Sequence, residues 1–152
     1  MGNREKNSIK GMSCLLPDQS VNELLLYMSS LEYDYYSPWC LKIASREMML
    51  PESVKGLAIT PSYLRELGHQ AIWELVLHVY PMCAPKTEIE TYEDFLNSSC
   101  LCCMIYYDCG WLDIYIKDDV LFADIQTWLQ KLEAKEIVLL TDANDKRTIM
   151  HC

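Results

Sequence analysis

The chain has 152 residues, of which 51% are hydrophobic and 23% are charged, a composition typical of one globular domain with a substantial core. Its 22 acidic and 13 basic residues give a formal net charge of −9, which argues against a nucleic-acid-binding protein, because such proteins must neutralise phosphates. No apolar run is long enough to span a bilayer, and residues 1–6 lack the apolar segment of a signal peptide. We therefore expect a cytoplasmic protein without a nucleic-acid or membrane partner.

The first part of the chain predicts two strands, two helices and an aromatic loop. Ser20 begins a capping box, and the apolar residues that follow recur at helical spacing as far as Leu31. Thr60 and Pro61 are typical of a helix start, and we expect Gly68 to end that helix in a left-handed conformation. The expected elements are a strand at 8–16, a helix at 20–31, a loop at 33–39, a strand at 40–49 and a short helix that begins at 60.

The second part of the chain predicts four strands and two helices. Residues 71–80 alternate in hydrophobicity, with Glu74 and His78 on the polar side, which indicates a half-buried strand. Residues 100–107 are continuously apolar, as in a strand covered on both faces, and Gly110 allows a tight hairpin turn. The other expected elements are a short helix at 91–97, a strand at 111–117, a helix that Asp118 caps and a strand at 136–141.

The helix after Asp118 has the clearest pattern, because its apolar residues form one continuous stripe. That stripe comprises Leu121, Ile125, Trp128, Leu129 and Leu132. Together the elements predict an α+β fold: a mixed, largely antiparallel sheet with helices packed mainly on one face. We expect a single domain over residues 1–152, with residues 1–7 flexible.

Eight cysteines are present, and in a reducing cytoplasm free cysteine behaves as a small, buried apolar residue. Cys100 and Cys103 have C-x-x-C spacing, but no second pair follows with the spacing of a zinc site. The pair also lies within an apolar strand instead of opening a helix, as a redox pair would. We therefore expect neither a metal site nor a cofactor.

No catalytic motif is present in the chain. His69 and His78 have no neighbouring serine or cysteine in the setting of a nucleophile, and the five glycines form no phosphate-binding loop. Residues distant in the sequence can still meet in a fold, for example His78 beside Glu74 or Cys102. The sequence favours a protein that acts by binding, with no catalytic residues, over an enzyme.

Aromatic and acidic residues indicate a binding surface. Tyrosine and tryptophan, which are enriched at interface hot spots, crowd residues 33–39 beside an acid, although these rings could instead close the core over the first helix. Residues 11–41 contain four acids and residues 87–116 contain six, with no lysine or arginine in either stretch. We predict a partner-binding surface formed by Tyr33, Asp34, Tyr35, Tyr36, Trp39, Glu90, Glu93 and Asp113.

Several segments together carry a family resemblance, namely KGMSCLLP (10–17), IETYEDFL (89–96), YYDC (106–109), DIY (113–115) and LTDANDKRT (140–148). They resemble a family of short proteins from Bacillus-type bacteria, and the resemblance spans nearly the whole chain except residues 48–71. At least one member of that family, the YxxD-like protein, is identified as the immunity partner of a secreted LXG-type toxin with nuclease activity. The resemblance therefore implies an immunity protein, or antitoxin, that binds a cognate toxin domain, a nuclease, and occludes its active site.

The implied function agrees with the charge of the chain, because an acidic surface can occupy the basic cleft of a nuclease as its substrate would. A second class stays open, a small-ligand-binding or regulatory domain without catalytic activity. Its pocket would lie between sheet and helices, with Tyr92, Tyr106 and Trp111 near the mouth. A broad acidic or aromatic face favours the immunity protein, and a deep apolar pocket favours the ligand-binding domain.

Overall fold

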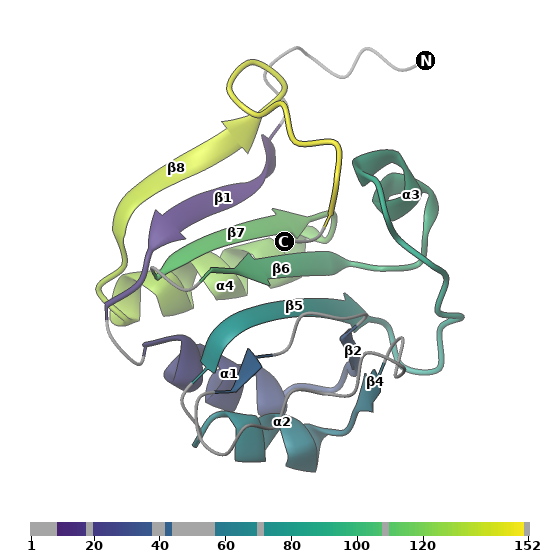
Figure 1. Cartoon of the computed structure of the whole chain (residues 1–152), viewed down its shortest axis with the longest axis vertical. Coiled ribbons are helices and arrows are strands. Elements are labelled where there is room, and N and C mark those ends of the chain that lie inside the picture. The colour runs from purple at the N-terminus through teal and green to yellow at the C-terminus, as the bar shows by residue number, and fades with distance from the viewer. Residues whose placement is uncertain are drawn as a thin grey trace.

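Figure 1 shows the computed structural model of the chain, which describes residues 9–17, 20–37, 42–43, 57–69, 72–107 and 110–150. Residues 1–7, Trp39 and most of the strand expected at 40–49 lie outside these residues. The helices are α1 (Ser20–Ser29), α2 (Pro61–Leu67), α3 (Tyr92–Asn97) and α4 (Asp119–Lys131). The strands are β1 (Ile9–Leu15), β2 (Asp34–Ser37), β3 (Lys42–Ile43), β4 (Leu57–Ile59), β5 (Ile72–Tyr80), β6 (Cys102–Tyr106), β7 (Trp111–Ile116) and β8 (Lys135–Thr141).

The strands form one sheet in the order β4-β2-β5-β6-β7-β1-β8. β3 pairs with β5 off this path and continues the line of β2 along it, since Tyr36 is opposite His78 and Lys42 is opposite Glu74. Every strand pairing in the described residues is antiparallel. The predicted α+β fold with a largely antiparallel sheet is confirmed.

Three helices, α1, α2 and α4, cover one face of the sheet, which we call the helix face; α4 lies behind β6 and β7 in Figure 1. The stripe predicted on α4 is confirmed, because Leu121, Ile125 and Leu129 are fully buried in the core of this face. The Asp118 carboxylate caps α4 by accepting a hydrogen bond from the Leu121 N–H at 2.9 Å. Trp128 is only partly buried and stacks on Tyr27 of α1.

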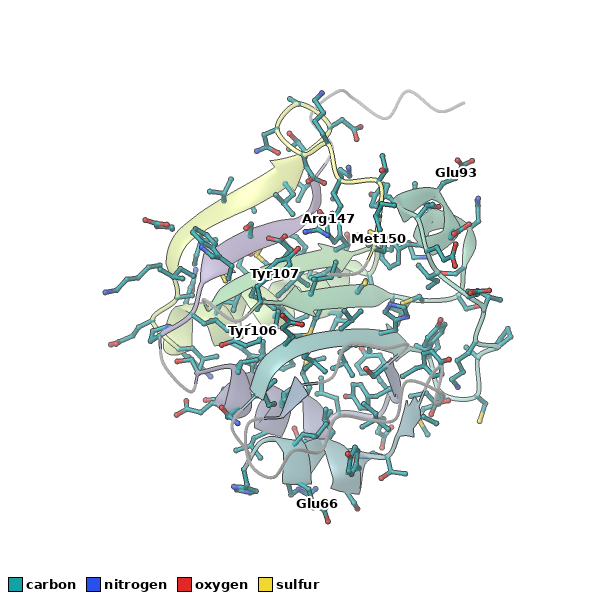
Figure 2. All side chains as sticks on the ribbon, in the orientation of Figure 1. Glu66, Glu93, Tyr106, Tyr107, Arg147 and Met150 are labelled. Carbon is teal, nitrogen blue, oxygen red and sulfur yellow. The ribbon has the colours of Figure 1, made fainter. Side chains whose placement is uncertain are left out.

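The opposite face, which we call the second face, is covered by α3 and by the C-terminal segment, defined as residues 142–150. Phe95 of α3 and Met150 of the C-terminal segment are buried there against Tyr80 and Tyr115 of the sheet. Figure 2 shows Met150 in front of the central strands. The central strands of the sheet are therefore buried on both sides, which explains why β6 is apolar at every position.

The helix expected to run to about Leu31 is α1, which ends at Ser29. Two expectations about local structure are wrong. Residues 34–37 form β2 instead of part of a loop. Gly68 is right-handed, with φ −63° and ψ −13°. A glycine is favoured at this position for space, because a Cβ there would lie 2.7 Å from the Leu26 side chain.

His78 is not on a solvated polar side of β5, contrary to the alternation pattern, because its side chain is only 1% exposed. β5 lies in the middle of the sheet between β6 and the β2–β3 line, so neither of its faces reaches solvent there. A polar residue in an alternating strand indicates a wet face only when one face of the sheet is open.

Candidate functional site

The aromatic segment splits between the two faces of the sheet, as strand alternation requires. Tyr35 is 2% exposed in the core of the helix face, and its hydroxyl donates a hydrogen bond to the Met28 carbonyl. Tyr33 packs on the same core and is partly buried. For Tyr35 the structure therefore matches the alternative stated above, that these rings close the core over the first helix. Trp39 lies outside the described residues.

Asp34 and Tyr36 lie on the side of the second face. Tyr36 is partly buried, with its ring centroid 6.3 Å from that of His78. The Asp34 carboxylate accepts hydrogen bonds from Lys86 Nζ at 2.6 Å and from the Cys83 N–H at 2.8 Å. These two bonds, with Lys86 the larger cause, lower the pKa of Asp34. Asp34 is therefore already paired within the chain.

Glu90 and Glu93 lie at the start of α3 and are exposed, and Figure 2 shows Glu93 on the outer edge of the molecule. Neither has an ion-pair partner in the part of the chain that the structure describes. Their neighbour Asp94 completes a capping box with Thr91, and its carboxylate accepts from the N–H groups of Thr91 and Glu90. Of the predicted acids, Glu90 and Glu93 keep their charges open to solvent.

Asp113 lies near the middle of β7 on the second face, and both of its carboxylate oxygens are bonded. The Ser13 hydroxyl donates to Oδ1 at 2.7 Å and Arg147 Nη2 donates to Oδ2 at 3.0 Å. The Tyr107 hydroxyl lies 3.4 Å from Oδ2. Burial raises the pKa of Asp113, the Ser13 hydrogen bond opposes that rise, and the nearby Asp145 carboxylate adds to it.

A second carboxylate, Asp145, binds the C-terminal segment to the sheet. It accepts from the Tyr115 hydroxyl at 3.1 Å and from Lys10 Nζ at 3.2 Å. Lys10 is 8% exposed, and its ammonium lies 4.1 Å from the centroid of the Tyr92 ring. A buried charge is strongly destabilising when it has no partner. Removal of either Lys10 or Asp145 would therefore leave the other charge buried with one partner fewer.

The structure therefore brings Asp34, Tyr36, Glu90, Glu93 and Asp113 to the side of the second face and leaves Tyr33 and Tyr35 on the helix face. Sequence reasoning missed Arg147 and Lys86, which neutralise two of the predicted acids. A charge count along the two acidic stretches omits the cations that only the fold brings near them. The one signal for Arg147 was its place in the LTDANDKRT segment of the resemblance.

His78 is the unusual polar residue of the second face. Neither of its ring nitrogens has a hydrogen-bond partner, and burial lowers its pKa to about 4. Its neighbours across the strands are Tyr36 and Cys103, not Cys102, which belongs to the core of the helix face. Among the described residues, neither ring nitrogen is hydrogen-bonded to an acid that could orient it or to a nucleophile that it could activate.

We expect the free energy of unfolding to fall as the pH drops from about 6.5 towards 4. In that window the unfolded chain binds a proton at His78 and the folded chain does not. The resulting loss in the free energy of unfolding reaches about 3 kcal/mol at a pH below the folded pKa, where His78 is protonated in both states. Urea unfolding of the wild type and of His78→Leu across this range measures the effect. The variant should lose less stability than the wild type, and His69→Leu, at an exposed histidine, should behave like the wild type. Equal pH dependence in all three proteins would contradict the prediction.

A cavity lined by described residues bears on the ligand-binding alternative. A cavity of about 320 Å³ lies between β1, α3, β7 and α4. Tyr92 lines it, as expected, but Tyr106 and Trp111 do not. Lys10 and Lys117 also line it, and both ammonium groups are already bonded, Lys117 to two carbonyls at the end of α3.

The described cysteines are free thiols. Burial raises the pKa of Cys14 and of Cys100 to about 12, so these two are protonated at neutral pH. Cys83 is exposed on the loop after β5. Within the described residues, no group of three or more His, Cys, Asp and Glu side chains is arranged to hold a metal ion.

Comparison with known proteins gives one match. The model of a family described as "Protein of unknown function (DUF2691)" matches residues 67–151, more than half of the chain. The match covers β5 to the C-terminal segment, including Asp113, Asp145 and Arg147. No curated protein and no solved structure matches the chain. In the part of the chain that the structure describes, no helix has the length and apolar character needed to cross a membrane. The chain belongs to the DUF2691 family.

Proposed function

We propose that this protein is an immunity protein that binds a basic toxin domain, a nuclease, in the cytoplasm of the producing cell and occludes its active site, and that it is not an enzyme. The observation that carries the proposal is an acidic edge, defined as Glu88, Glu90 and Glu93, whose side chains are exposed and without ion pairs in the described residues. The net charge of −9 and the family resemblance support the same class of partner.

The acidic edge favours a basic partner for a physical reason. Unpaired carboxylates on one edge of a negatively charged protein attract cationic surfaces and raise the rate of encounter. This attraction weakens with salt, because the Debye length is only ~8 Å at physiological ionic strength. Among the described aromatic residues predicted for the interface, Tyr36 is the one that lies half-buried on the same side of the sheet.

We expect charge reversal at the acidic edge to slow association with the toxin domain encoded by the neighbouring gene. Glu90→Lys and Glu93→Lys should each lower the association rate several-fold at low salt and much less at high salt. Glu66→Lys is the matched control, since Glu66 is exposed on α2, far from Glu93 (Figure 2). The association rate is measured by stopped-flow or surface-binding kinetics at two salt concentrations.

Two results would count against the proposal. One is a neighbouring toxin domain that does not bind the wild type at all. The other is an association rate that responds equally to Glu66→Lys and Glu93→Lys, because that result would reflect total charge and not the acidic edge. A cavity-filling change such as Leu96→Trp should leave toxin binding intact, whereas it would abolish binding in a small-ligand domain that used the cavity between α3 and α4.

A further inference from the structure

The guanidinium of Arg147 contacts a carboxylate and an aromatic ring, the two kinds of group that bind a guanidinium ligand. Its Nη2 donates to Asp113 Oδ2 at 3.0 Å, and its central carbon lies 5.6 Å from the centroid of the Tyr107 ring. Arg147 reaches this place from the C-terminal segment, and its Nη1 also donates to the Ile149 carbonyl of that segment at 3.2 Å. Asp113 belongs to β7, and Tyr107 directly follows β6. Figure 2 shows Arg147 and Tyr107 next to each other in front of the strands.

We infer that Ser13, Tyr107 and Asp113 form an arginine-recognition site on the second face, which Arg147 occupies in the free protein and which an arginine of the basic partner takes in the complex. The inference rests on the proposed function for the identity of the partner. The site itself is argued from the contacts of Arg147 and stands without it.

The receiving groups are held in place by the sheet. Ser13 of β1 and Asp113 of β7 are directly opposite in the strand register, and the Ser13 hydroxyl fixes Oδ1 at 2.7 Å. Tyr107 directly follows β6, and its N–H donates to the Trp111 carbonyl at 2.9 Å. A site built on neighbouring strands keeps its geometry when its occupant leaves, so the next occupant meets a preformed site.

The chemistry of the site selects arginine over lysine. A guanidinium is planar, so it can lie on an aromatic ring and donate to a carboxylate at the same time, and it is more weakly hydrated than an ammonium. The Asp113 side chain is 18% exposed and the Arg147 side chain 22% exposed, so both can be reached from solvent. An incoming guanidinium that replaces Arg147 leaves the Asp113 carboxylate paired, which limits the free-energy cost of exchanging one arginine for another.

The C-terminal segment is held next to the acidic edge of the proposed interface. Thr148 accepts from the Tyr92 N–H and Met150 donates to the Glu90 carbonyl, both at 2.9 Å. A partner that binds at Glu90 and Glu93 therefore lies beside the segment that carries Arg147. The site gives such a partner a second contact of defined chemistry.

The site is tested without any partner by chemical rescue of Arg147→Met, which keeps the apolar stem and removes the guanidinium. Millimolar ethylguanidinium should raise the thermal unfolding midpoint of this variant saturably, and ethylammonium at equal concentration should do so less. The wild type should bind the same probe about tenfold more weakly or worse, because its own Arg147 competes. Arg147→Lys, which keeps the charge but not the planar group, is measured alongside and should also respond to ethylguanidinium.

The double variant Arg147→Met with Asp113→Asn is the control, and it should lose the saturable response. No saturable response in either Arg147 variant, or an equal response in the double variant, would overturn the inference. Its failure is distinct from failure of the proposed function. Toxin binding without rescue leaves the immunity function and removes the site, whereas rescue without toxin binding leaves an arginine site in a protein with another role.

Discussion

We expect Ile125→Asp to unfold the protein and Ile125→Leu to leave it folded. Ile125 is fully buried on α4, inside the core between that helix and the sheet. An unpaired carboxylate at this place costs several kcal/mol, comparable with the ~5–15 kcal/mol that stabilises a whole domain. The leucine conserves volume and apolar character, so its cost should stay below about 1.5 kcal/mol.

Val120→Asp is the matched control, because Val120 lies on the same helix and is 68% exposed. It introduces the same charge five residues before Ile125 and should change the free energy of unfolding little, as surface substitutions do. Circular dichroism and urea unfolding of the three variants make the comparison. A folded Ile125→Asp protein would mean that α4 presents a different side to the sheet.

Among the described glycines, we expect the replacement of Gly11 by alanine to lower the free energy of unfolding most. Gly11 lies in β1, opposite Tyr115 of β7 and Leu140 of β8. A Cβ at this position would lie 1.8 Å from the Ile114 carbonyl oxygen and 2.9 Å from the Tyr115 Cα, both of them backbone atoms. Backbone inside a sheet cannot rotate away as a side chain can, so β1 and β7 must separate. We expect a loss of several kcal/mol or failure to fold.

Gly68→Ala makes the same chemical change where the obstacle can move. The nearest atom to its added Cβ is the end of the Leu26 side chain, and the backbone there is already right-handed. Alanine also has the better helix propensity, so the net loss should be small. Urea unfolding of the two glycine variants tests the contrast, and a Gly11→Ala protein as stable as Gly68→Ala would contradict it.

The parts of the fold that the sequence predicts are those that local pattern determines. The apolar stripe from Leu121 to Leu132 predicts the buried side of α4. The continuous apolar run at 100–107 predicts a strand that is buried on both faces. The prediction of a wet side for His78 failed because a strand pattern cannot show what later covers the sheet. The sequence does not show that the Tyr36 ring of β2 comes to lie 6.3 Å from the His78 ring, measured between centroids, on the face that α3 and the C-terminal segment cover.

The candidate site was predictable in its exposed residues and not in its paired ones. Glu90 and Glu93 are acidic, local and exposed, and nothing in the fold changes that. Asp34 and Asp113 had the same sequence signal, but Lys86 and Arg147 reach them across the structure. Counting charges along a stretch of chain cannot detect a cation that arrives from another stretch. Tyr35 was misplaced for a related reason, because a short strand in an aromatic segment turns alternate rings to opposite faces.

The place of β1 determines the order in which this sheet can be assembled. β1 lies between β7 and β8, and its contacts join residues as far apart as Ser13 and Asp113, which are separated by 100 positions. Among the described strands, β8 pairs with β1 alone. During synthesis β1 therefore precedes both of its partners, and β5, β6 and β7 can pair as neighbours before β1 joins them. In the described sheet β8 is connected to β7 only through β1, so we expect β8 to join the sheet only once β1 is in place.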